Sequence, residues 1–277
     1  MDFLVVEARL LSHRTIMTQE DINTFFRAQS SFWGNVYSGQ GVFAEIIQDR
    51  HTAVLGWVDS LNLPRGSHVL EIGCGAGFMA VALALRGYKV CAIDSVEAMI
   101  EVTRDHAAIC CVTEQLSADV GNVYALDFED SSFDLVVAIG ILPWLENIDL
   151  AISSMARVVK FGGNLILTSA NPCGLPYLLD PLYWPALRPL RERVKAMLGR
   201  NGPGMAFHGR RAIIKVLSHA GVSVVKDMTL GFDFSLLRHK IIPEPHATNL
   251  YHRMQRSHNF HSLGMSYHVL ARKCTPI

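Results

Sequence analysis

The 277-residue sequence has no long hydrophobic run, although half of its residues are hydrophobic. A helix that crosses a bilayer needs roughly 18 or more consecutive apolar residues, so no membrane-spanning segment is expected. The N-terminal stretch Met1–Glu7 also carries acids where an export signal would carry lysines. We therefore expect a cytoplasmic protein, and the chain length predicts one large domain with room for additional elements.

Cysteines are few and irregularly spaced. The six cysteines form no C-x-x-C pair, and three of them fall in strand or turn positions of the expected core. Disulfide and zinc frameworks need characteristic cysteine spacings. The pattern is typical of reduced core thiols, and neither a disulfide scaffold nor a zinc site is expected. The sequence also shows no internal repeat and no low-complexity tract.

The formal net charge is zero, but the two halves of the chain differ in sign. Residues 1–138 contain 8 Lys/Arg against 18 Asp/Glu, a balance of −10, and residues 139–277 contain 17 against 7, a balance of +10. Such a division favours a polar molecule with one end that meets an anionic partner. The alternative is that the halves interleave in space and their fields largely cancel.

The most informative segment runs from residue 69 to residue 94. The apolar stretch 69–72 leads to three glycines and a helix-forming segment, and a second apolar run, 90–93, ends on Asp94. This order of strand, glycine turn, helix, strand and acid is the first βαβ unit of a nucleotide-binding α/β sheet. Glycine lets the backbone approach a ligand closely. An acid at the tip of a strand can accept hydrogen bonds from two ribose hydroxyls.

The spacing of the glycines separates two classes of ligand. A dinucleotide site has the pattern G-x-G-x-x-G and holds a pyrophosphate at the helix N-terminus. Here the third glycine, Gly77, comes one residue early, Phe78 stands in its usual place, and Glu71 precedes the turn. An acid at that position repels a pyrophosphate and suits a cationic ligand. The segment E-x-G-x-G-x-G closely resembles motif I of the class I S-adenosylmethionine (SAM) methyltransferases, whose ligand carries a sulfonium and an ammonium.

Further segments resemble the same family. Residues 121–134 are similar to the family's G-D-A-x-x-L-P-F-x-D-x-S-F-D, with Asn122 where the family usually has Asp. An Asn oxygen can still accept from the adenine amino group. Residues 135–139 read as a buried strand, and residues 157–163 resemble the turn into the fifth strand. The resemblance covers about residues 24 to 171 well and the remainder in outline.

The resemblance implies SAM as the cofactor and a set of residues that bind it. The glycine turn and the acid after the second strand supply most of this set. Tyr37, in an N-terminal cap, is expected to lean on the methionine moiety, and Met99 is spaced to touch the adenine face. The cofactor-binding residues expected on this basis are Tyr37, Glu71, Gly73, Cys74, Gly75, Gly77, Asp94, Ser95, Met99, Asn122, Val123 and Ile139.

The fold class that the resemblance implies is α/β, a Rossmann-like sheet of seven mostly parallel strands with an antiparallel last strand. Four regions are expected: a helical N-terminal cap (1–65), a SAM-binding core (66–171), a substrate lid (172–210), and the C-terminal part of the sheet (211–277), with a long insertion between its last two strands. Strands are expected near 69–72, 89–93, 115–120, 133–139, 163–169, 222–228 and 265–272, and helices near 18–27, 42–61, 96–108, 147–160 and 208–220, with a break at 31–37.

Aromatic and basic residues mark the cap and the lid. For Phe32 and Trp33 ordinary core packing is expected. Residues 187–198 carry an apolar stripe at helical spacing with basic residues around it, which suits an anionic membrane surface or an acidic carrier. The alternative is a helix packed on the sheet edge with solvated charges. The expected contacts of the acceptor are Trp144, Tyr177 and Trp184.

Histidines are the candidates for a general base. A hydroxyl or activated carbon nucleophile must lose a proton, and a nearby histidine is the usual agent. His208 is the first candidate because it is expected to open the helix after the lid, and His239 and His13 are the others. The segment 231–264 holds five histidines, but only one close pair, H-x-x-H, so a metal site is not expected there.

These observations predict a SAM-dependent methyltransferase of the ubiquinone/menaquinone-biosynthesis-like small-molecule type. The expected acceptor is small and largely apolar or aromatic, and the expected reaction is O-methylation. C- or N-methylation is the alternative within the class. A SAM-binding protein with other chemistry, such as a cyclisation, and a non-catalytic subunit are the alternatives outside it. A nucleic-acid substrate is not expected, because residues 139–143 do not match an Asn-Pro-Pro-Tyr-type motif.

Overall fold

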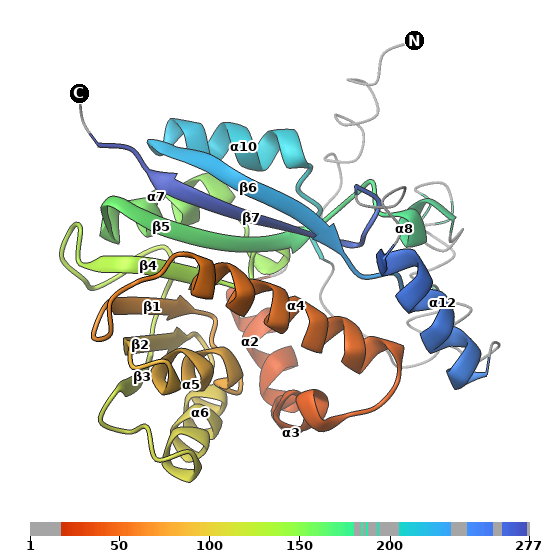
Figure 1. Ribbon diagram of the computed structural model, residues 1–277, viewed down its shortest axis with the longest axis horizontal. Helices are drawn as coiled ribbons and strands as arrows, with labels where there is room; N and C mark the ends of the chain where they lie inside the picture. The colour runs from red at the N-terminus through yellow and green to blue at the C-terminus, as the bar shows by residue number, and fades with distance from the viewer. Residues whose placement is uncertain are drawn as a thin grey trace.

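A seven-stranded sheet forms the centre of the molecule (Figure 1). The computed structural model describes residues 18–179, 184, 187, 193, 205–233, 243–256 and 262–275. The strand order is β3-β2-β1-β4-β5-β7-β6, with the first five parallel and β7 antiparallel to both neighbours, which confirms the predicted fold class. The bounds are β1 His68–Ile72, β2 Lys89–Asp94, β3 Leu116–Val120, β4 Phe133–Ala138, β5 Val159–Ala170, β6 Val222–Leu230 and β7 Ser266–Lys273.

The register of the central strands decides where the functional edge lies. Val69 of β1 pairs with Val90 of β2 and with Leu135 of β4, and all three are almost fully buried. Parallel strands in such a sheet are buried on both faces, which explains their near-continuous apolar sequences. Because the strands run in one direction, the segments that follow β1, β2 and β4 emerge at the same edge of the sheet.

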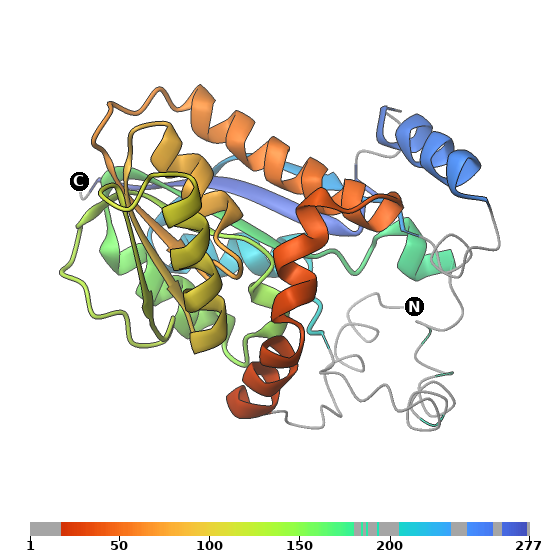
Figure 2. The same ribbon diagram turned by 90° about the horizontal axis from the view of Figure 1, so that it is seen from below.

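Helices cover both faces of the sheet (Figures 1 and 2). One core contains residues of α7 and α10, and the other contains residues of α4, α5 and α6. Amphipathic periodicity accounts for both sides, since each helix buries one stripe against the strands. The bounds are α4 Val42–Ser60, α5 Phe78–Leu85, α6 Glu97–Ile109, α7 Ile148–Val158 and α10 Arg210–His219.

The N-terminal cap consists of α2 (Gln19–Ala28), α3 (Ser30–Asn35) and the short 3-10 helix η1 (Val36–Ser38). Thr18 caps α2 through a reciprocal capping box with Asp21. The expected break at 31–37 is wrong, because the chain turns only at Gln29 and then continues as α3 and η1. Phe32 is 45% exposed, so its expected core packing is also wrong.

The C-terminal insertion contributes α12 (Glu244–Arg256), which packs on the N-terminal half of α4 (Figure 2). Tyr251 is fully buried, and its hydroxyl donates to Asp49 of α4 at 2.5 Å. In the expected lid region, α8 spans Leu175–Leu179. Among the described helices none is long and apolar enough to cross a membrane. The division of the chain into a cap, a core, a lid and a C-terminal part stays a prediction.

Candidate functional site

The glycine turn between β1 and α5 forms the centre of the candidate site. The amides of Gly73 and Cys74 both donate to the carbonyl of Ile93, at 2.7 and 3.1 Å, which ties the turn to the end of β2. Gly73 and Gly77 have φ angles of +72° and +77°, a region that L side chains rarely adopt. A Cβ on Gly73 would lie 2.1 Å from the side chain of Ile141, so only glycine fits there.

Asp94 joins the tip of β2 to the glycine turn. Its two carboxylate oxygens accept from the amides of Gly75 and Val96, each at 3.0 Å. Burial raises the pKa of this carboxyl, and the backbone N–H groups oppose the rise by stabilising its charged form. Each oxygen keeps a second lone pair. The arrangement therefore leaves Asp94 able to accept from vicinal hydroxyls.

Glu71 lies inside the protein at the end of β1. Burial, followed by the neighbouring charge of Asp94, raises the pKa of Glu71 to about 8. Its Oε2 is buried and has no hydrogen-bond partner among the described residues. Without a cation beside it Glu71 is therefore mostly protonated at neutral pH, and a cationic ligand would favour its ionised form.

The segment after β3 reaches the same edge. The amide of Gly121 donates to the carbonyl of Asp94 at 2.9 Å, which places Asn122 next to the acid. The Asn122 oxygen accepts from the amide of Tyr124 at 2.9 Å, as in an Asx turn. Val123 is buried in the core below. The adenine-binding roles expected for Asn122 and Val123 therefore have the right location and remain predictions.

Four other expected cofactor residues lie on or near this edge. Cys74 is buried, and its thiol has a pKa well above the usual value, with burial as the largest cause, so it stays protonated. Met99 is almost fully buried on α6. Ser95 follows Asp94 and exchanges hydrogen bonds with Asn23 of α2. Ile139 packs against the core on the side of α5.

Tyr37 covers the glycine turn from the side of the cap. Its ring stacks on Phe78 with the centroids 4.1 Å apart and the planes at 27°. Burial raises the pKa of Tyr37, and the nearby Arg50 opposes the rise. The structure thus places Tyr37 against the start of α5, and its expected contact with the methionine moiety remains a prediction.

Arg50 is a candidate that the sequence interpretation missed. It hydrogen-bonds to Tyr37, and a Cβ on Gly140 would lie 3.1 Å from its guanidinium, so it reaches the end of β4. Burial lowers the pKa of Arg50, and only its interactions with Tyr37 oppose this shift. Its Nε has no hydrogen-bond partner among the described residues. A signal existed in the sequence, because Arg50 shares a helix face with the buried Val54 and Trp57 at spacings of four and seven.

His268 lies beneath Arg50 on β7. It is completely buried against the edge of Trp57, and neither ring nitrogen has a partner among the described residues. Burial and then the charge of Arg50 lower the pKa of His268 to about 3, so the ring is neutral. The charge of Arg50 is therefore not balanced from this side. On the neighbouring strand, Thr168 accepts from the amide of Gly140 at 2.7 Å.

The expected acceptor contacts lie in two places. Trp144 ends the short helix η2 (Leu142–Trp144), directly after β4, and packs edge-on against Phe26 of α2 at 5.3 Å. Tyr177 is buried on α8 and packs against Phe207 at 5.0 Å. Trp184 is 47% exposed, and its indole N–H donates to the carbonyl of Leu178.

Of the histidines proposed as a general base, only His208 falls within the described residues. It precedes α10, whose N-cap is Gly209, so the expectation that His208 opens the helix is wrong by two residues. The backbone of this segment is fixed near η2, because the amide of Ala206 donates to the carbonyl of Pro143 at 2.7 Å. His13 and His239 lie outside the described residues.

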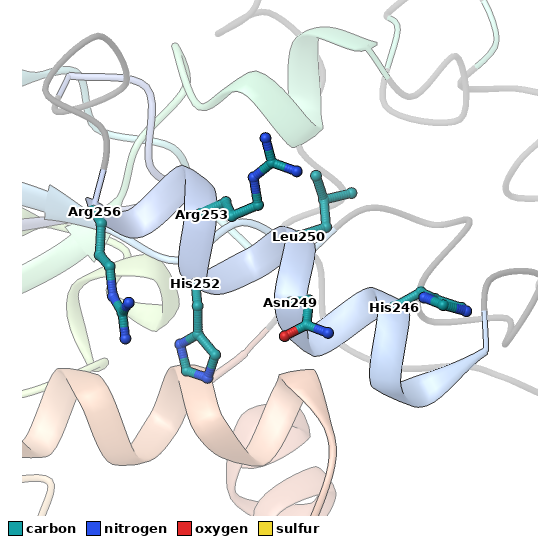
Figure 3. Close-up of a pocket in the computed structure, with 6 residues that line it drawn as sticks. All are labelled: His246, Asn249, Leu250, His252, Arg253 and Arg256. Atoms are coloured by element: carbon teal, nitrogen blue, oxygen red, sulfur yellow. The ribbon is translucent and has the colours of Figure 1, made fainter.

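The basic side chains of α12 form a separate hollow of about 530 Å³ (Figure 3). His252 points toward α4, where its Nε2 lies 3.4 Å from Glu45. In Figure 2, α12 lies beyond the end of α4 that is remote from α5 and α6. The hollow is therefore not part of the glycine-turn site. Its lining residues are His246, Asn249, Leu250, His252, Arg253 and Arg256.

The comparison with protein families agrees with this geometry. Residues 70–167, from β1 to β5, match the family model described as "Methyltransferase domain". This part of the chain is similar to the methyltransferase domain of SAM-dependent methyltransferases. The match covers the glycine turn, Asp94, Asn122 and η2. In this family the cofactor is SAM, in agreement with the sequence interpretation.

Curated relatives and solved structures extend the comparison. A ubiquinone biosynthesis O-methyltransferase of Paracidovorax citrulli is 30% identical over 45% of this chain and 52% of its own length. A sterol 4-C-methyltransferase of Caenorhabditis elegans is 26% identical over 56% of this chain and 46% of its own length. The chain spans about half the length of the curated relatives it matches. A magnesium protoporphyrin IX methyltransferase from Synechocystis PCC 6803, solved with bound SAH, shares the fold at a TM-score of 0.63 and 19% identity. The superposition covers 92% of this chain and 100% of that chain.

The residues of this chain fit SAM on chemical grounds. Arg50 is a cation without a carboxylate partner among the described residues. Glu71 and Asp94 are two acids whose pKa values burial raises, to about 8 in the case of Glu71. A ligand that brings a carboxylate, a cationic centre and ribose hydroxyls complements all three groups at once.

Proposed function

We propose that this chain transfers a methyl group from SAM to an oxygen of a small, largely apolar or aromatic acceptor. The observation that carries the proposal is the pairing of Arg50, whose charge no described carboxylate balances, with the buried acid Glu71 across the glycine turn. These two groups suit the two ends of an amino-acid zwitterion. The O-methyltransferase relative supports oxygen as the acceptor atom.

The chain's own residues would hold SAM in an extended groove along the sheet edge. Asp94 would accept from the ribose hydroxyls, Asn122 would face the adenine, and Arg50 with Tyr37 would meet the carboxylate. When bound, SAM supplies a methyl group that its sulfonium makes electrophilic. The protein's task is then to align the acceptor, exclude water and remove a proton.

His208 is the proposed proton acceptor. It lies two residues after Ala206, which is hydrogen-bonded to η2, and η2 directly follows the end of β4 where the acceptor would sit. A neutral imidazole can take the proton of a hydroxyl as the methyl group is transferred. Trp144, Tyr177 and Trp184 are proposed to contact the acceptor.

The acceptor's surroundings are also part of the proposal. A lipophilic acceptor partitions into membranes, so the basic stripe predicted in 187–198 would bring the site to an anionic surface. All of that stripe except Leu187 and Arg193 lies outside the described residues. The proposed location is the cytoplasm, with peripheral contact to a membrane.

C-methylation is a second candidate, favoured by the likeness to the sterol 4-C-methyltransferase. Incubation with SAM and either a catechol or a sterol, followed by mass spectrometry, tests both candidates. A methyl ether of the catechol together with SAH supports the proposal. A C-methylated sterol would favour the second candidate, and SAM consumption without SAH would show that the chemistry is not methyl transfer.

A further inference from the structure

Six aromatic side chains form a continuous strip from η2 to the start of α4, called here the aromatic strip. Neighbouring rings lie 5.3 to 6.2 Å apart, with edge-on or tilted planes. None of the six belongs to the three hydrophobic cores of the described residues. The strip therefore needs an explanation other than core packing. Its members, in spatial order, are Trp144, Phe25, Phe26, Trp33, Phe32 and Phe43.

The inner end of the strip lies at the sheet edge that carries the glycine turn. Helix α2 is bonded through Asn23 to Ser95, at the tip of β2, and packs through Phe26 on Trp144, just after β4. Since β1 lies between β2 and β4 in the sheet, α2 crosses the edge at which the glycine turn emerges. The outer end is open, because Phe32 and Phe43 are 45% and 41% exposed.

Trp33 occupies the middle of the strip and carries its unpaired polar atom. The Trp33 ring lies between Phe26 and Phe32, and its Nε1 is buried without a hydrogen-bond partner among the described residues. An indole N–H only donates, so its missing partner must be an acceptor. Buried donors are rarely left unpaired, because the unpaired state costs free energy.

We propose that the aromatic strip is the acceptor subsite, and that Trp33 selects a flat aromatic ring bearing an oxygen. The rings of Phe25, Phe26 and Trp144 supply faces and edges that pack against such a ring. The indole N–H of Trp33 donates to its oxygen, which fixes the ring's orientation beside the methyl donor. The assignment rests on the proposed function, since it names the acceptor class of that same site.

A matched pair of probes tests the role of Trp33. In SAH-saturated protein, calorimetry compares 2-naphthol with 2-methylnaphthalene, which has the same shape but no oxygen. Wild type should bind 2-naphthol about tenfold more tightly, the usual size of one buried hydrogen bond. The variant Trp33→Phe keeps a ring but loses the donor, so its preference should fall to about twofold or less.

Trp57→Phe is the matched control, because Trp57 lies in the core between α4 and β7, outside the strip. It should keep the preference of wild type. Equal binding of both probes to wild type, no binding of either probe, or a preference that survives in Trp33→Phe would overturn the assignment. The probes are also measured without SAH. A failure of SAH binding would overturn the proposed function, and these measurements distinguish it from a failure of the aromatic strip.

Discussion

At the scale of single residues, the site holds charges that the protein does not balance by itself. Glu71 is buried with Asp94 as its nearest charge, and Arg50 is buried with the phenol of Tyr37 as its partner. Burial of a charge without a partner disfavours its charged form. Both groups therefore destabilise the ligand-free protein, and the proposed zwitterionic ligand would offset this cost.

The pKa of Glu71 gives a pH dependence of stability with a definite sign. Its folded-state value of about 8 is above the ordinary 4.5, so the folded protein keeps this proton longer than the unfolded chain. The free energy of unfolding should then fall as the pH rises from about 4.5 to about 8, by at most about 1.4 kcal/mol per pH unit. Urea unfolding between about pH 6 and pH 8 should show this fall in wild type and a smaller one in Glu71→Gln. Parallel pH profiles would refute the assignment of the shift to Glu71.

Arg50→Met should weaken SAM binding by a factor of about 10 to 100, the loss of a charge-assisted hydrogen bond worth roughly 1.5–3 kcal/mol. The control ligand is 5′-methylthioadenosine, which has the nucleoside and the sulfur but no carboxylate. Its affinity should be nearly the same in wild type and variant, and Arg50→Lys should retain part of the SAM affinity. An equal loss for both ligands would mean that Arg50 acts through the fold and not through the carboxylate.

At the scale of elements, α2 is the weakly held piece of the site. It buries one residue, Ile22, and is tied to the sheet edge through Asn23 and two phenylalanines. Elements with few buried contacts open more readily than the core. A ligand that lies between α2 and the glycine turn should therefore add contacts to the side of α2 that faces the glycine turn.

Hydrogen exchange tests this arrangement. SAH should slow amide exchange in α2 (Gln19–Ala28) and in the glycine turn, because ligand contacts stabilise the closed position of the helix. Helix α10 packs on the opposite face of the sheet and serves as the internal control, with little change expected. Equal protection of α2 and α10 would indicate a general stabilisation and would contradict the position assigned to α2.

Some of the elements could be predicted from the sequence and others could not. The strands β1, β2 and β4 were predictable because each combines an apolar run with a glycine or acid at or just after its end, and both features are local. The short α3 was not, because Ser30–Asn35 has little helical periodicity and is held by aromatic contacts from α2. Arg50 was missed for a related reason. Its spacing to Val54 and Trp57 indicated burial, but its contacts with Tyr37 and Gly140 form only in the folded chain.

At the scale of the whole molecule, the negative N-terminal half supplies β1 to β4 and the cap, and the positive half supplies β5 to β7 with α8, α10 and α12. The sheet separates these halves along its width, since β4 and β5 are neighbours. The charge asymmetry therefore follows the strand order, although α4 of the negative half packs on α12 and β7 of the positive half. The polar molecule stays a prediction.

The predicted anionic contact of 187–198 belongs to this scale. Replacing Arg188, Arg191, Arg193 and Lys195 with Ser should remove binding to anionic vesicles, since each basic residue near such a surface contributes about 1 kcal/mol. Co-sedimentation at low salt is the measurement, and the affinity for SAM should not change. Wild type that remains in the supernatant with anionic vesicles would rule out the membrane contact.

Calorimetric titration with SAM tests the central claim most directly. Wild type should bind SAM and SAH with micromolar affinity and show no heat with NAD. Gly75→Val should abolish this binding, because Gly75 has a φ of +54° and nothing within 4 Å of its Cβ position, so the side chain would occupy the open space beside the glycine turn that SAM is proposed to fill. Tight binding of NAD with no heat from SAM or SAH would contradict the account.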